Sequence, residues 1–250
     1  MSFTATDTTQ RLDIGSMLQE LLSVIGRNIG SFGLLGLVMI GAPSALLAVS
    51  RALGEANFGF ALLGFLGFLA TVVARPIFYG AIIHGTLRQL DGEPASMAEC
   101  LKAGRRRWGT MLGLMISAGL LTGLGLVFLI VPGIILALRW AVAGPLVVTG
   151  GRSISDSMAR SAKLTEGRRW SMFLFYLVVF LALACAVALI AAVGAGVASV
   201  TSEVVAAVVV SPLYNTGMEV VLAAASAVLF RRLRTDKEGP APDALAEVFA

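Results

Sequence analysis

Three ionisable side chains lie inside long apolar stretches of the sequence, where a charge is costly and is often kept for a function. They are Arg75, Arg139 and Glu219. A charged side chain at the centre of a bilayer costs about 2.5–3.5 kcal/mol, so each should face protein, water or an opposite charge. Arg139 and Glu219 fall near the middle of their apolar stretches, and we expect them to form an ion pair. Ser211, Asn215 and Glu219 recur every fourth residue, which predicts a polar stripe along one helix face.

Two interpretations of these residues are open. The functional interpretation is a binding site at the midplane of a membrane, for a lipid headgroup or an anionic solute. Its candidate residues are Arg75, Arg139, Asn215 and Glu219. The structural interpretation is an ion pair that fixes the register of two helices. Arg75 has a further option, because a long basic side chain near the end of a span can extend to the membrane surface.

The sequence offers few groups for catalysis or metal binding. It holds one histidine, His84, and two cysteines, Cys100 and Cys185. Reactive sites usually combine cysteine and histidine at metal-ligand spacing, paired carboxylates, or histidine beside an acid. The sequence shows none of these patterns. We therefore expect no enzyme activity, no metal and no cofactor.

Arginine and tryptophan gather in two polar segments that precede apolar stretches. Residues 104–108 read GRRRW and residues 167–170 read GRRW. Basic side chains and tryptophan favour the headgroup level of a membrane, where each Lys or Arg contributes about 1 kcal/mol toward anionic lipid. The other interpretation is that these charges only orient the chain. The candidate headgroup residues are Arg105, Arg106, Trp108, Arg168, Arg169 and Trp170.

The composition predicts an integral membrane protein. Of the 250 residues, 57% are hydrophobic and 14% are charged, whereas a soluble domain has about 25% charged residues. The mean hydropathy is +0.88. The net charge of +4 is spread over segments that flank apolar stretches, so nucleic acid is not an expected partner. Membrane lipids are the expected partners, and the sequence does not indicate an oligomeric state.

Six apolar stretches are long enough to cross a hydrocarbon core of about 30 Å. Pro132-Gly133 predicts a tight turn between the third and fourth spans. The fourth span is then short, and a re-entrant segment is the alternative. The glycine pairs 109/113 and 119/123 predict close helix packing on the third span. The expected spans are about 31–50, 58–86, 109–131, 133–150, 170–198 and 204–230.

The basic residues predict the orientation of the chain. Segments 88–107, 151–169 and 231–237 hold most of the arginine and lysine, whereas the connections between them on the other side hold little. An excess of these residues marks the cytoplasmic side, so we expect both termini there. The N-terminus does not have the pattern of a secretory signal. The expected parts are an N-terminal segment with an interfacial helix (1–30), a membrane domain (31–230) and a flexible tail (231–250).

A weak internal repeat groups the spans in pairs. Ser-Met at residues 16, 96 and 157 is followed eight to ten residues later by Gly-Arg and then by a pair of apolar stretches. The residues between have one apolar face at helical spacing, as in helices that lie in the headgroup plane. The predicted fold is an all-α integral membrane protein. It has six transmembrane helices as three hairpins, each preceded by a short amphipathic interfacial helix.

Three strings of residues carry a family resemblance. They are SAKLTEGRRW (161–170), VPGIILALR (131–139) and GEPAS (92–96). With them, residues 12–235 resemble a bacterial six-span family, the membrane domain of glycerophosphoryl diester phosphodiesterase. The resemblance implies a multi-pass protein of the inner membrane. Ala162 departs from the family, which usually has an aromatic residue at that position.

The resemblance does not imply hydrolysis. In the family, phosphodiesterase activity belongs to a fused catalytic barrel, which is not expected in this chain. Two functions are therefore open. The first is a non-enzymatic inner-membrane protein that organises or senses lipids at the cytoplasmic leaflet. The second is a carrier or channel for a small solute or lipid that uses Arg75, Arg139 and Glu219.

Overall fold

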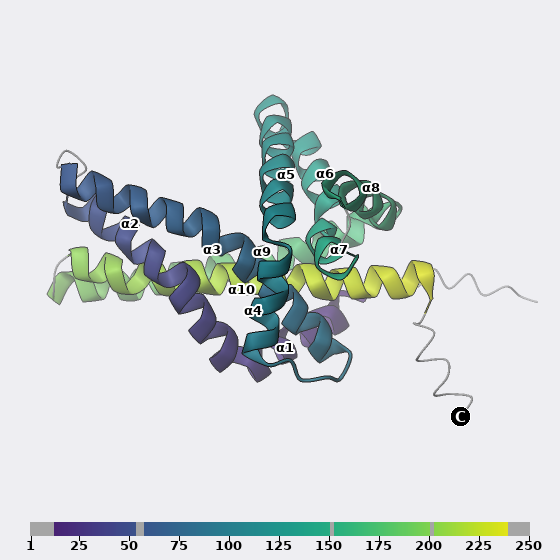
Figure 1. The fold of residues 1–250 in the computed structure, drawn as a ribbon, viewed down its shortest axis with the longest axis horizontal. Helices are drawn as coiled ribbons and strands as arrows, with labels where there is room; N and C mark the ends of the chain where they lie inside the picture. Colours follow the sequence, from purple (N-terminus) through teal and green to yellow (C-terminus); the bar gives the residue numbers. More distant parts are fainter. Residues whose placement is uncertain (1–12, 54–57, 151–152, 201–202, 240–250) are drawn as a thin grey trace, which may run out of the picture.

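The computed structural model describes residues 13–53, 58–150, 153–200 and 203–239, and every regular element in these ranges is helical. Figure 1 shows α10 running along the length of the molecule. The helices α1, α2, α3 and α9 pack most extensively against it. The elements are α1 (Ile14–Gly36), the π-helical turn η1 (Leu37–Gly41), α2 (Ala42–Leu53), α3 (Phe58–Leu90), α4 (Met97–Arg106), α5 (Trp108–Phe128), α6 (Ile130–Trp140), α7 (Ala143–Gly150), α8 (Ile154–Thr165), α9 (Arg169–Val200) and α10 (Glu203–Glu238).

Six helical stretches in the described residues are long and apolar enough to cross a membrane, as the sequence predicts. Many of their large apolar side chains lie on the outside, and Phe58, Val127 and Phe128 are at least 80% exposed. An exposed apolar surface of this extent suits contact with lipid chains. The stretches are Ile14–Leu53, Phe58–Leu90, Trp108–Phe128, Ile130–Gly150, Arg169–Gly196 and Val208–Glu238.

In both α3 and α10, the side chains of the N-terminal part are more exposed than those of the C-terminal part. Seven large apolar side chains of α3 between Phe58 and Val73 are exposed, whereas most positions from Pro76 to Thr86 are buried. On α10, Leu213 is exposed, but most side chains over 220–233 are buried. The main core therefore lies at the C-terminal ends of these two helices, and their N-terminal parts present apolar surface outward.

The N-terminal part of the chain differs from the predicted arrangement of a separate interfacial helix and a span over 31–50. Instead, α1, η1 and α2 form one helical stretch from Ile14 to Leu53 (Figure 1). Pro43 lies in the first turn of α2. Because proline lacks an N–H and crowds the carbonyl four residues earlier, it disturbs a regular α-helix. The wider π-helical turn just before it lets the chain continue in the same direction.

Glycines let the N-terminal stretch approach its neighbours closely. A Cβ atom on Gly36 would overlap the side chain of Thr216 on α10. A Cβ atom on Gly67 of α3 would lie 3.0 Å from the carbonyl oxygen of Pro43 on α2. Close backbone contact through small residues is the usual way in which membrane helices pack.

The turn between α5 and α6 is not at the predicted Pro132-Gly133. Leu129 is the extended residue between the two helices, and Pro132 lies in the first turn of α6, where a missing N–H leaves no hydrogen bond unmade. Gly133 lets the two helices meet, because a Cβ atom there would lie 2.7 Å from the backbone nitrogen of Leu126. The proline–glycine pair therefore predicts a break between the correct two helices, but the turn itself is at Leu129.

The fourth candidate span is interrupted. Its first part, α6, ends at Trp140, and α7 begins at Ala143. At this break the hydroxyl of Ser161, on α8, donates to the carbonyl oxygen of Arg139 at 2.8 Å. A carbonyl near the end of a helix lacks its intrahelical partner, and the buried serine supplies one. The span over 133–150 and its re-entrant alternative stay predictions.

The short helices α4 and α8 lie where the repeat predicts its second and third interfacial helices. Ser96 and Glu99 form a capping box at the start of α4, in which each side chain accepts a hydrogen bond from the other residue's N–H. The bond from the Ser96 backbone N–H lowers the pKa of the Glu99 carboxyl below its ordinary value. The location of these helices in the headgroup plane, and the grouping of the spans as three hairpins, stay predictions.

The last helix continues beyond the predicted sixth span. The sequence predicts a span over 204–230 and a flexible tail over 231–250, but α10 remains helical to Glu238. Residues 240–250 of the predicted tail lie outside the described residues, as do residues 1–12 of the N-terminal segment. The additional turns of α10 carry ion pairs to other parts of the protein.

Candidate functional site

A cavity of about 960 Å³ lies between α3, α5, α6, α9 and α10. This volume is at the upper end of the range of about 300–1,000 Å³ that is usual for small-molecule sites. Aliphatic and aromatic side chains form most of its walls. Five lining side chains carry nitrogen or oxygen atoms: Arg75, Tyr79, Trp140, Tyr176 and Glu219.

Arg75 and Glu219 form an ion pair that lines this cavity. The side chain of Glu219 is 10% exposed and that of Arg75 is 55% exposed, so a buried carboxylate meets a guanidinium that reaches the surface. The predicted Arg139–Glu219 pair is therefore wrong. Arg75 is the partner of Glu219 because α3 packs directly along α10.

Tyr79 places a hydroxyl group close to the ion pair. It lies one helical turn after Arg75 on α3, and residues four apart share a helix face. Its hydroxyl donates to the hydroxyl of Ser226 at 3.3 Å, which in turn donates to a carbonyl oxygen of its own helix. Tyr79 is near enough to both Arg75 and Glu219 to interact with their charges. The polar part of the cavity thus holds a cation, an anion and a phenol.

Arg139 and Asn215 do not join this cavity, although both were candidate binding residues. Arg139 is exposed on α6. The amide nitrogen of Asn215 donates to the carbonyl oxygen of Ser211, one turn earlier on α10, at 2.8 Å. Of the predicted polar stripe on α10, Glu219 lines the cavity, whereas Ser211 and Asn215 do not.

The aromatic residues of the cavity were not among the sequence candidates. Trp140 and Tyr176 lie in apolar stretches, where such residues usually belong to the core or the lipid-facing surface. Only Tyr79 could have been selected from the sequence, because it follows Arg75 at the helical spacing of four residues. The convergence of five helices that forms the cavity has no local signature in the sequence.

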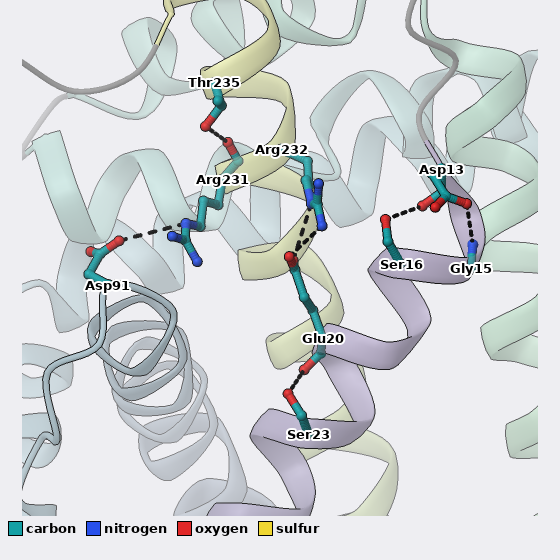
Figure 2. A network of polar contacts seen from close by, with 9 residues as sticks. All are labelled: Asp13, Gly15, Ser16, Glu20, Ser23, Asp91, Arg231, Arg232 and Thr235. Carbon is teal, nitrogen blue, oxygen red and sulfur yellow. Dashed lines mark hydrogen bonds and ion pairs between the residues drawn. The ribbon is translucent and has the colours of Figure 1, made fainter. Parts of the chain in front are cut away.

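The end of α10 forms a polar network with α1 and with the turn after α3, which Figure 2 shows. Arg232 pairs with Glu20 of α1. Arg231 pairs with Asp91, with 3.7 Å between Nε and Oδ1. These side chains are partly exposed, so each pair contributes at most about 1 kcal/mol. Their combined effect is to hold α10 against two separate parts of the chain.

The polar segment 157–170 contacts the same end of α10. The ammonium of Lys237 donates to the carbonyl oxygens of Lys163 and Glu166 at 2.7 and 2.9 Å. These carbonyls are at the end of α8, where helical partners are missing. Two ion pairs support the contact, Arg160–Glu238 and Arg168–Asp236. This charged segment therefore binds the C-terminal end of α10.

Three of the candidate headgroup residues are exposed. Arg105 and Arg106 are exposed at the end of α4 and have no ion-pair partner within the described ranges. Trp170 is 71% exposed and stacks on Phe173 with 5.4 Å between the ring centres. These side chains are free to contact lipid headgroups.

The other candidate headgroup residues have contacts inside the protein. The indole N–H of Trp108 donates to the carbonyl oxygen of Val73 at 2.9 Å. Arg168 pairs with Asp236 at 2.8 Å. The Nε of Arg169 is buried, and the described residues give it no hydrogen-bond partner. The two basic segments are thus unequal, because the first is exposed and the second is largely used in packing.

A family resemblance is confirmed for the second part of the chain. Residues 112–232 match the family model described as the membrane domain of glycerophosphoryl diester phosphodiesterase. The match includes the strings at 131–139 and 161–170, whereas 92–96 lies outside it. No curated protein and no solved structure matches the chain. With its six apolar helical stretches, the chain is a multi-pass membrane protein.

Proposed function

We propose that this membrane protein, which resembles that membrane-domain family over residues 112–232, is a non-enzymatic protein of the bacterial inner membrane. It organises or senses lipids at the cytoplasmic leaflet. The observation that carries the proposal is the exposure of Arg105 and Arg106, without ion-pair partners among the residues described. Exposed basic side chains at a membrane surface attract anionic headgroups. Arg168 contributes less, because Asp236 already neutralises it.

Replacing both Arg105 and Arg106 with glutamine is expected to weaken the retention of anionic lipid. At about 1 kcal/mol for each residue, the loss corresponds to roughly 10- to 30-fold. The measurement is the amount of phosphatidylglycerol that stays bound to detergent-purified protein. Arg51→Gln is the matched control, because it removes the same charge from an exposed position at the end of α2. Equal retention in both variants would mean that the α4 arginines only orient the chain.

A carrier or channel for a small solute or lipid is the second candidate function. The observation that favours it is the Arg75–Glu219 ion pair in a large cavity. Transport of charged solutes commonly uses ionisable residues within membrane helices. Arg139, the third residue predicted for this function, is outside the cavity.

For the carrier function, Glu219→Gln is expected to abolish solute flux in protein-containing vesicles while protein abundance is kept. Inorganic phosphate is a suitable probe, because its charge suits the exposed guanidinium of Arg75. Arg139→Gln is the control and should leave flux unchanged. Phosphate flux in wild-type vesicles no greater than in protein-free vesicles would contradict this function for phosphate.

A further inference from the structure

The cavity between α3, α5, α6, α9 and α10 has the length and lining that an acyl chain needs. Met111 and Leu126 both line it, and they lie fifteen residues apart on α5. At about 1.5 Å per residue this is about 22 Å, more than half of a hydrocarbon core of about 30 Å. Between them, Leu114 and Ala118 continue the apolar wall. A chain as long as one leaflet fits along α5.

The charged part of the cavity lies at its Met111 end. A Cβ atom on Gly80 would lie 3.9 Å from the terminal methyl of Met111, and Gly80 follows Tyr79 directly on α3. Arg75 lies one turn before Tyr79 on the same helix. An amphipathic molecule in the cavity would thus have its polar group near Arg75 and its chain pointing toward Leu126.

The level of Arg75 along α3 suits a headgroup. The exposed apolar side chains of α3 end at Val73, and the buried part begins at Pro76. At this level α4 crosses α3, because a Cβ atom on Gly104 would overlap the carbonyl oxygen of Ile77. Gly104 directly precedes the exposed Arg105 and Arg106. The basic end of α4 and the ion pair of the cavity therefore lie at similar positions along α3, where its lipid-exposed surface ends.

We infer that the cavity binds a zwitterionic phospholipid, with its phosphate at Arg75, its ammonium at Glu219 and one acyl chain along α5. The ion pair has no net charge. An anionic lipid would place uncompensated charge beside the buried carboxylate, which is costly in a medium of low polarity. A zwitterionic headgroup replaces one internal ion pair by two ion pairs with the ligand, so the site stays neutral. Aromatic rings at Tyr79, Trp140 and Tyr176 also favour an ammonium group nearby.

This site is distinct from the α4 surface of the proposed function, so either can fail without the other. The test uses full-length protein in bilayer discs that hold equal amounts of phosphatidylethanolamine and phosphatidylglycerol. After extraction in mild detergent, native mass spectrometry identifies the lipid that stays bound. Wild-type protein is expected to enrich phosphatidylethanolamine roughly tenfold over phosphatidylglycerol, because only its headgroup can form charge-assisted hydrogen bonds with both Arg75 and Glu219.

Filling the cavity is expected to remove this bound lipid. Ala118→Phe places a ring in the space beside α5, and Ala137→Phe does so independently from α6. Ala182→Phe is the matched control, because Ala182 is exposed on α9 and does not line the cavity. The control should keep the wild-type enrichment. Enrichment in both cavity variants equal to that of wild type would overturn the inference.

Changing the charge balance is expected to reverse the lipid preference. Glu219→Gln leaves Arg75 as a single positive charge, so phosphatidylglycerol should become the enriched lipid. A misfolded protein would lose both lipids and could not show this reversal. The Arg105→Gln/Arg106→Gln variant should enrich phosphatidylethanolamine at least as strongly as wild type, because it removes only the proposed binding of phosphatidylglycerol at α4. A preference of the Arg105→Gln/Arg106→Gln variant for phosphatidylglycerol, or an unchanged preference in Glu219→Gln, would refute the assignment.

Discussion

Replacing Gly104 with alanine is expected to lower the free energy of unfolding by about 3 kcal/mol. The added Cβ atom would overlap the carbonyl oxygen of Ile77 and lie 3.1 Å from the backbone nitrogen of Ala81. Because both are backbone atoms of α3, no side chain can rotate away, and α4 must move. Overpacking of this kind costs about 1–3 kcal/mol and sometimes more. The two helices are already close at the facing residue Gly80, since a Cβ atom there would lie 3.1 Å from the Cα of Gly104.

Thermal unfolding of the purified protein in detergent measures this effect. For a protein of this size, about 3 kcal/mol corresponds to a fall of about 6–12 °C in Tm. Gly109→Ala is the matched control, because nothing lies within 4 Å of a Cβ atom at Gly109 in α5. In a helix with free space, alanine stabilises by about 0.5–1 kcal/mol relative to glycine. Similar Tm changes of the same sign for both variants would contradict the close contact of α3 and α4.

The glycines show why spacing alone does not identify helix contacts. The sequence predicts close packing at the glycine pairs 109/113 and 119/123. Gly113 does meet a neighbour, because a Cβ atom there would lie 2.5 Å from Cδ1 of Ile154 on α8, but at the other three glycines it would meet nothing within 4 Å. Close contacts between backbones occur elsewhere, as at Gly80 and Gly104. A glycine pattern marks a face that can be approached, but which helix approaches it depends on the packing of the whole chain.

The number of spans and the short helices α4 and α8 could be predicted because each has a local cause. A bilayer requires about 20 apolar residues for each helix, and an apolar face at helical spacing indicates a short amphipathic helix. The continuous helix from Ile14 to Leu53 was not predicted, because polar and apolar parts of one helix resemble two elements. The helical end of α10, to Glu238, depends on ion pairs to residues far away in the sequence.

The sequence predicted that charged residues in apolar stretches form the candidate site, but it identified only some of the residues that line the cavity. Arg75 and Glu219 were selected because charge is rare in apolar stretches, and they line one cavity. Their pairing was missed, since the position of a residue within its own span does not say which helix lies beside it. Arg139 was preferred because it lies near the middle of a predicted span, but α6 exposes it.

Removing the side chain of Arg75 is expected to cost more stability than removing that of Glu219. Arg75→Ala leaves a carboxylate that is 10% exposed without its partner. Breaking a buried pair costs about 3–5 kcal/mol, and the 55% exposure of Arg75 lowers our expectation to about 2–3 kcal/mol. Glu219→Ala leaves an arginine that already reaches the surface and can extend further. Its expected cost is about 1 kcal/mol.

A double-mutant cycle in detergent-purified protein tests which arginine is the partner. Combining Arg75→Ala with Glu219→Ala removes both charges, so the double variant should be more stable than Arg75→Ala alone. Combining Arg139→Ala with Glu219→Ala should give the sum of the single effects, because residues that share no interaction act independently and Glu219 pairs with Arg75. If Arg139→Ala restored the stability lost in Glu219→Ala and Arg75→Ala did not, the ion pair described here would be wrong. The asymmetry between the single variants adds a second criterion, since equal costs would mean that Glu219 is as accessible to solvent as Arg75.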